Sequence, residues 1–182
     1  MGQLKPLLPW CGVTLIEYQI ANLLHAGLDE VIVVLGHEAG AILPRIKMLK
    51  ATHVVNPDYR RGKATSIKTG LRLVSPDADA IVLLAVDQPR SGDLIALVLH
   101  SHVTNNALIT SPRYQGRGGH PVVFSSALRS EMEGISDETE GLRKVFRSHE
   151  GEINAVHIDD PQGGLDLNTY EDYERARGTY EC

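Results

Sequence analysis

The chain has 182 residues, enough for one packed domain and too many for a mini-protein held together by disulfides. Hydrophobic residues make up 42% and charged residues 23%, an ordinary globular composition that excludes disordered, collagen-like and coiled-coil chains. The net charge of −5 has the wrong sign for a protein that binds duplex nucleic acid or an anionic membrane surface, so we expect neither partner.

Predicted helices and strands alternate along the whole chain. Thr14 and Glu17 form a capping box at the start of a helix over residues 14–26, and Thr169 with Asp172 forms a second one at the start of the last helix. The nearly continuous runs of β-branched residues and leucine at 30–36 (EVIVVLG) and 80–86 (AIVLLAV) predict central parallel strands. Further strands are expected at 52–56, 107–111, 121–124 and 153–158, and further helices at 65–74, 93–102, 126–133 and 141–148.

This alternation predicts an α/β fold, a three-layer sandwich around a mostly parallel, Rossmann-like sheet. No linker or repeat divides the sequence, so we expect a single domain over residues 1–182, with a flexible loop at 113–119 (RYQGRGG). In such sheets ligands bind beyond the carboxyl ends of the strands, which is where functional residues should lie.

The two cysteines, Cys11 and Cys182, have neither metal-ligand spacing nor the pattern of a disulfide framework. We therefore expect two inert thiols in a cytoplasmic protein. No apolar run approaches the roughly 20 residues of a membrane span, and residues 1–8 lack the apolar stretch of a signal peptide.

Asp87 is the first candidate for chemistry because it directly follows the strand at 80–86. Its carboxylate suits a hard cation such as Mg²⁺, which takes oxygen ligands and bridges substrate phosphates. An aspartate here can equally be a turn or helix-capping residue, and both interpretations stay open.

Two other segments have polar groups at the start of a predicted helix. Residues 60–66 (RRGKATS) place three cations and a glycine there, which could hold phosphate or be a solvated basic turn. Asp166 and Asn168, just before the last helix, could complete a metal site or merely cap that helix.

Several other functions lack their motifs. Pro57 and Ala64 stand where a Walker A loop needs glycine and a hydroxyl residue, and the glycines at 116, 118 and 119 do not form a dinucleotide-binding fingerprint. The histidines have no partners at zinc-site spacing, and the sequence has no GxSxG elbow.

Five segments in register resemble the nucleotidyltransferase family that includes molybdenum cofactor cytidylyltransferase, the MobA-like NTP transferases. The segments are KPLLPWCGVTLIEYQI (5–20), RGKATSIKTGLRL (61–73), VDQPR (86–90), GGHPVVF (118–124) and LDLNTYEDYERA (165–176). They span nearly the whole chain, and the last two favour the cytidylyl branch of the family.

The resemblance implies transfer of CMP from CTP, with Mg²⁺, onto the phosphate of a molybdopterin-type cofactor, with release of pyrophosphate and possible hand-over to a molybdoenzyme. Position by position, it implies that Asp87 and Lys5 are catalytic and that Asp87 holds the metal together with Asn168 or Asp166. It also implies that the nucleotide is contacted by Lys5, Gly62 and Ser66. The acceptor would be contacted by Gly119, His120 and Pro121.

The sequence departs from the family pattern in two places. Tyr170 stands where the family has proline and Asn168 where it often has aspartate, and an asparagine ligand carries less charge. The family also opens with an apolar strand and a Gly/Ser-rich loop, of which Met1 and Gly2 resemble only the end. We therefore expect that the first strand and the main phosphate loop are missing from this sequence.

Two alternatives to the cytidylyltransferase remain. One is a non-catalytic cofactor-binding or molybdoenzyme maturation protein of the same fold, which the absent loop favours. The other is a sugar-phosphate nucleotidyltransferase, which would share Asp87 but not the likeness of GGHPVVF.

Overall fold

The computed structural model describes residues 4–180, in which strands and helices alternate as expected. The strands are β1 (Pro9–Trp10), β2 (Val13–Thr14), β3 (Ile32–Leu35), β4 (Thr52–Val55), β5 (Ala80–Leu83), β6 (Ile109–Tyr114), β7 (Arg117–Gly118), β8 (Val122–Ser125) and β9 (Ile153–His157). The α-helices are α1 (Leu15–His25), α2 (Ala39–Ile46), α3 (Lys63–Leu71), α4 (Gly92–Thr104), α5 (Arg129–Glu133), α6 (Leu142–Ser148) and α7 (Tyr170–Thr179).

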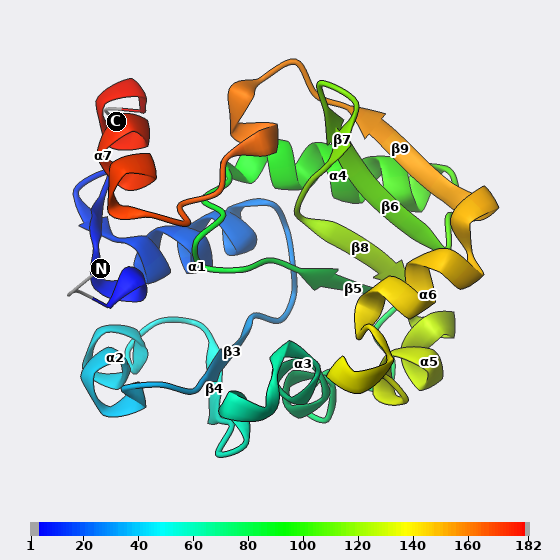
Figure 1. The fold of residues 1–182 in the computed structure, drawn as a ribbon, viewed down its shortest axis with the longest axis horizontal. Coiled ribbons are helices and arrows are strands. Elements are labelled where there is room, and N and C mark those ends of the chain that lie inside the picture. Colours follow the sequence, from blue (N-terminus) through cyan, green and yellow to red (C-terminus); the bar gives the residue numbers. More distant parts are fainter. Residues whose placement is uncertain (1–3, 181–182) are drawn as a thin grey trace.

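The strands form two main sheets, which lie side by side in Figure 1. β3 pairs in parallel with β4. In the five-stranded sheet, β8 lies between β5 and β6 and is antiparallel to both, whereas β6 and β9 are parallel. The α/β class is confirmed, and the sheet is mixed: β5, expected to have parallel neighbours, is paired with the antiparallel strand β8.

Helices cover both faces of the five-stranded sheet, which gives the three layers. Val122 and Phe124 of β8 belong to a core cluster that contains residues of α3, α5 and α6. Val123, which points to the opposite face, packs with Leu94 and Val98 of α4. A separate cluster joins β3 to α1 and α2.

Sequence signals that act locally are confirmed. Both capping boxes form: Thr14 begins α1 through Glu17, and Thr169 begins α7 through Asp172. The expected loop at 113–119 is instead largely a hairpin, because Tyr114 pairs with Arg117 across a turn in which positions 115 and 116 both have positive φ.

No strand lies between β3 and β5 among the described residues, and neither strand has a partner on its second edge. The carbonyls of Val31 and Leu35 bond to amides of residues 52 and 56. Because successive backbone groups of a strand point to alternate sides, the amides of Ile32 and Val34 face the free edge.

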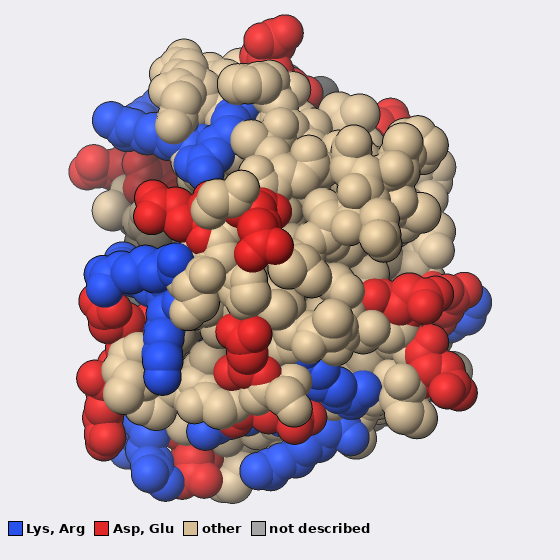
Figure 2. All heavy atoms as spheres, turned by 90° about the vertical axis from the view of Figure 1, so that its right-hand side faces the viewer, with Lys and Arg blue, Asp and Glu red and all other residues tan. Residues whose placement is uncertain are grey.

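Three further features of the described chain bear on the expectations. Cys11 is disulfide-bonded, so the expectation that it is an inert free thiol is wrong; Cys182 lies outside the described residues. No helix within residues 4–180 is long and apolar enough to cross a membrane. On the face shown in Figure 2, acidic and basic side chains are interspersed among uncharged ones.

Candidate functional site

The loop after β5 brings Asp87 against the N-terminal segment. Lys5 lies in a short 3-10 helix, η1 (Lys5–Leu7), and its Nζ atom is 3.1 Å from Oδ2 of Asp87. The two side chains are 29% and 31% exposed, so both groups remain accessible to a ligand. The structure therefore joins the two residues that were predicted to be catalytic.

The segment before α7 lies beside the same loop. Leu167 donates its amide hydrogen to the carbonyl oxygen of Asp87 at 2.8 Å and buries its side chain. Because successive side chains of an extended segment point in opposite directions, Asp166 and Asn168 are on the exposed side. Asp166 accepts a hydrogen bond from Gln88 at 2.6 Å, so this predicted metal segment lies next to Asp87.

The oxygen donors at this place fit a hard divalent cation such as Mg²⁺ better than a softer metal such as zinc or copper. Within residues 4–180, no group of three or more His, Cys, Asp or Glu side chains could hold a metal ion. Mg²⁺ needs fewer protein ligands, because one or two carboxylates act together with substrate phosphates and water. Asp87 and Asp166 offer such carboxylates, and the buried Oε1 of Gln88, which has no hydrogen-bond partner in the described chain, is an acceptor available to a water or ligand.

The predicted acceptor residues follow the β6–β7 hairpin. Gly119 donates its amide hydrogen to the carbonyl of Pro112, and a side chain at this glycine would collide with the carbonyl of Gly163. His120 is joined to the buried Pro121 by a cis peptide bond. Glycine is thus required at 119 by the close approach of two backbone segments.

The surroundings of His120 connect it to the carboxylates. Burial lowers the pKa of its ring, and the cations of Arg90 and Lys63 lower it further. Asp166 and Asp87 act in the opposite direction. These charges act on one ring, so His120 lies within electrostatic reach of both predicted metal residues, and a shared site for acceptor and metal stays a prediction.

The start of α3 is not an open phosphate-binding site. The amide of Ala64 donates to Oδ2 of Asp137 at 2.8 Å, so a carboxylate of the chain already occupies this position. Gly62 has φ of 118° and no room for a side chain beside Asp137. The hydroxyl of Ser66 accepts from Asn56 at 3.0 Å. Roles for Gly62 and Ser66 in nucleotide binding stay predictions.

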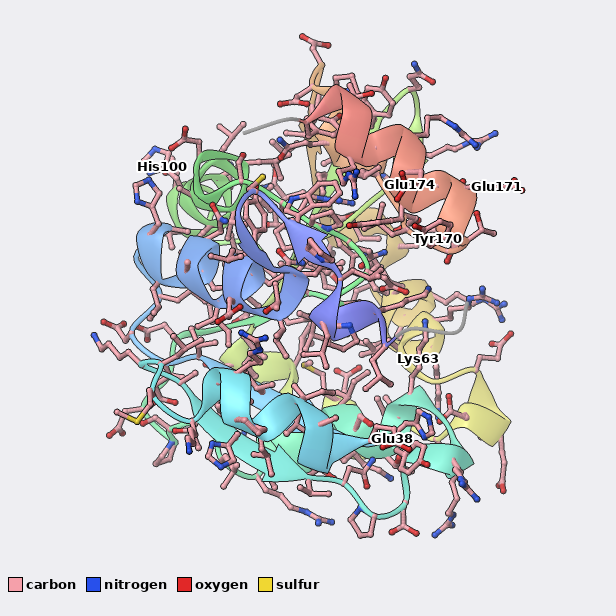
Figure 3. All side chains as sticks on the ribbon, turned by 90° about the vertical axis from the view of Figure 1, so that its left-hand side faces the viewer. Glu38, Lys63, His100, Tyr170, Glu171 and Glu174 are labelled. Carbon is pink, nitrogen blue, oxygen red and sulfur yellow. The ribbon has the colours of Figure 1, made fainter. Side chains whose placement is uncertain are left out.

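Figure 3 shows the side of the molecule on which these elements meet. Tyr170, on the first turn of α7, lies above the N-terminal segment, and Lys63, at the start of α3, lies below it. Lys63 forms no ion pair within the described chain, so it is a free cation at the edge of the site.

Two buried polar residues behind the site were missed from the sequence. Arg90 is 1% exposed and Gln19 is 5% exposed, and both bond to the loop that carries Asp87. A signal for Gln19 was present, because it occupies the apolar stripe of the helix at 14–26 between Ile16 and Ile20. Arg90 gave no such signal, since its partners are distant in sequence.

Comparison with known proteins identifies the family. The sequence model of the MobA-like NTP transferase domain matches residues 1–153. The chain belongs to the MobA-like NTP transferase family. The family resemblance inferred from the five segments is confirmed, and the fold is that of α/β nucleotidyltransferases.

Three similar proteins are informative. The chain is 30% identical to nicotine blue oxidoreductase from Paenarthrobacter nicotinovorans, over 94% of this chain and 86% of that protein. It is 27% identical to molybdenum cofactor cytidylyltransferase from Escherichia coli strain K12, over 99% and 90%. A crystal structure of a Mycobacterium tuberculosis H37Rv protein in complex with manganese superposes with a TM-score of 0.80 and 29% identity, covering 96% and 91% of the two chains.

Proposed function

We propose that this chain transfers CMP from CTP to the phosphate of a molybdopterin-type cofactor and releases pyrophosphate. Membership of a family of NTP transferases supports a nucleoside triphosphate donor, and the relative from Escherichia coli supports this acceptor and base. A molybdoenzyme is the partner that such a product implies.

The observation that carries the proposal is the cluster of Lys5, Asp87 and Asp166 beyond the carboxyl end of β5. In this reaction an oxygen of the acceptor phosphate attacks the α-phosphorus, one P–O bond forms, and the bond to pyrophosphate breaks. Such a step needs alignment and neutralisation of charge rather than a covalent intermediate. Lys5 is the cation placed to meet the phosphates.

Asp87 and Asp166, with the amide oxygen of Asn168, are the residues that would hold Mg²⁺. When bound, the ion would neutralise charge on the phosphates. A structural relative crystallised with manganese supports dependence on a divalent cation. Lys5 would then exchange its contact with Asp87 for contacts with the phosphates, a small loss because a partly exposed ion pair contributes about 1 kcal/mol or less.

The remaining predicted residues would set specificity. Gly119, His120 and Pro121 would face the acceptor, beside Lys63, whose free charge suits an acceptor phosphate. Gly62 and Ser66 would line the base pocket. We expect CTP to be preferred over GTP. A pocket whose polar groups hydrogen-bond to the edge of cytosine would leave those groups unpaired when guanine is bound.

A redox function is the second candidate, and one specific observation favours it. The relative with 30% identity is named as an oxidoreductase.

A transfer assay distinguishes these functions. The purified chain is incubated with Mg²⁺, molybdopterin-type cofactor released from a molybdoenzyme, and CTP or GTP labelled at the α-phosphate, with a sugar phosphate as the control acceptor. We expect the label to enter the cofactor at least 10-fold faster from CTP. Preference for GTP would move the protein to the guanylyl branch, and transfer to the sugar phosphate alone would support a sugar-phosphate nucleotidyltransferase. No transfer from any nucleotide would contradict the proposal.

A further inference from the structure

Arg90 is a buried cation, and within residues 4–180 its side-chain hydrogen bonds all go to backbone carbonyls. Its Nε donates to the carbonyl of His120 at 2.8 Å, and its Nη1 donates to those of Pro89 at 2.9 Å and Leu165 at 2.8 Å. A longer contact of 3.5 Å joins Nη2 to the carbonyl of Gly163. The planar guanidinium thus uses several of its donors in one fixed arrangement, which lysine could not reproduce.

These carbonyls belong to the three segments that form the site. Pro89 is on the loop of Asp87, and Leu165 directly precedes Asp166. His120 is the predicted acceptor residue itself. One side chain therefore connects three loops that are far apart in sequence and whose side chains must act on the same substrate.

The loop of Asp87 is also held from its other side. Gln19, on α1, donates to the carbonyls of Ala85 at 3.0 Å and Gln88 at 2.8 Å, and its Oε1 accepts from the amide of Arg90 at 3.3 Å. The backbone around Asp87 is therefore fixed by hydrogen bonds to the buried residue Gln19, and such bonds are costly to leave unmade.

The charge of Arg90 has no carboxylate in contact with it within residues 4–180. Burial lowers its pKa to about 10, so it remains a cation at neutral pH. Its field reaches the nearby ring of His120, whose pKa it lowers. Arg90 thus acts on the site both through geometry and through charge.

We propose that Arg90 is the positioning residue of this site, which holds the loops of Asp87, His120 and Asp166 in register. It touches no substrate in this role. A misplacement of reacting groups by about 1 Å can cost about 100-fold in rate, so loss of this connection should be visible in turnover.

Arg129 provides a matched control. Its guanidinium also donates to three backbone carbonyls, those of Ser75, Leu71 and Val74, at 3.0, 2.6 and 2.7 Å. These carbonyls lie at the end of α3 and beyond it, not in the loops of the site. Substitution of Arg129 should therefore disturb stability without disturbing the site.

The test compares Arg90→Lys and Arg90→Met with Arg129→Lys and Arg129→Met. We expect both Arg90 variants to lower kcat by about 100-fold or more with a smaller change in KM. Arg90→Met should also raise the pKa of His120, measured by NMR, and Arg90→Lys should raise it less because a cation remains. The Arg129 variants should leave both quantities unchanged. Folded Arg90 variants with wild-type kcat and an unchanged His120 pKa would overturn the proposal.

The measurement of kcat rests on the proposed function, whereas the NMR measurement of the His120 pKa does not. The proposed function and the role of Arg90 can therefore be contradicted separately. A wild-type chain without transferase activity would contradict the function alone. If the Arg90 variants do not fold, the wild-type chain provides a second test. Its Arg90 Nε–H proton should exchange with solvent far more slowly than the Nε–H proton of Arg61. Arg61 is the reference because its side chain is 75% exposed. Equal exchange of the two would overturn the proposal.

Discussion

At the scale of single residues, the side chain of Asp87 has a small structural role. Its carboxylate is partly exposed and contacts Lys5, while its backbone carbonyl, unaffected by substitution of the side chain, accepts from Leu167. A change of this side chain should therefore act on function and not on folding.

We predict that Asp87→Asn lowers kcat/KM by at least about 100-fold, equivalent to about 3 kcal/mol of transition-state stabilisation, because the metal loses a charged ligand. The melting temperature should stay close to that of the wild type. Asp93→Asn is the control, since Asp93 lies on the first turn of α4 with its side chain 96% exposed. Equal activity of the Asp87 variant and the control would show that Asp87 is only a turn residue.

The sequence revealed those site residues whose signal is their place next to a predicted element. Asp87 follows an apolar strand and Asp166 precedes a capping box, and both positions can be recognised from neighbours in the chain. Arg90 and Asp137 could not be recognised in this way. Their partners, the carbonyls near 120 and 165 and the amide of Ala64, are brought to them only by the tertiary fold.

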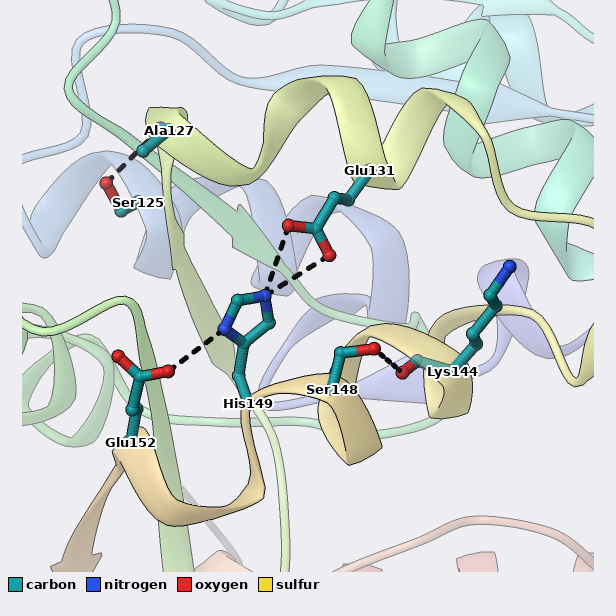
Figure 4. Close-up of polar contacts among 7 residues, drawn as sticks. All are labelled: Ser125, Ala127, Glu131, Lys144, Ser148, His149 and Glu152. Carbon is teal, nitrogen blue, oxygen red and sulfur yellow. Dashed lines mark hydrogen bonds and ion pairs between the residues drawn. The ribbon is translucent and has the colours of Figure 1, made fainter.

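At the scale of elements, His149 connects two helical segments (Figure 4). It follows α6 directly, and its Nε2 lies 3.1 Å from a carboxylate oxygen of Glu131 on α5. Its Nδ1 lies 3.3 Å from Glu152, in the short 3-10 helix that precedes β9. Hydrogen bonds to Glu131 and Glu152 raise the pKa of His149, because both carboxylates favour the protonated ring.

A raised pKa in the folded state means that protonation stabilises the fold. The contribution is fully present below the unfolded-state pKa of about 6.5 and is lost as the pH rises through the higher folded-state value. We predict that the wild type is more stable than His149→Gln at low pH and loses this advantage as the pH rises. The difference between the two free energies of unfolding, each measured in urea, should decrease from about pH 6 to about pH 8. Contributions of the other histidines are the same in both proteins and cancel in this difference. A difference that does not change with pH would contradict the raised pKa of His149.

Helices and strands were predictable from the sequence where a local motif marks them. They were not predictable where tertiary packing stabilises them. Both capping boxes identified their helices, because the cap and its partner are three residues apart. α2 was missed, because it contains Pro44 and its N-cap, Glu38, makes no side-chain hydrogen bond. Burial of Ile42 and Ile46 in the cluster with β3 stabilises this helix against its poor local sequence.

At the scale of the whole molecule, β3 and β5 each have one edge without a partner strand within residues 4–180. We predict that the amides of Ile32 and Val34, which face the free edge, exchange with deuterium much faster than those of β8, whose neighbours lie on both sides. Residue-resolved hydrogen exchange measures this directly. Equally strong protection of β3 and β8 at low protein concentration would show that the edge has a partner.

The central claim is that this site moves a nucleotide rather than electrons, and the products of one reaction test it most directly. The chain is mixed with CTP, Mg²⁺ and the molybdopterin-type cofactor, and the reaction is followed by ³¹P NMR. The account predicts equal amounts of pyrophosphate and of a new phosphoanhydride that links CMP to the cofactor. Intact CTP and unmodified cofactor, together with oxidation or reduction of an added redox substrate by the same preparation, would contradict it.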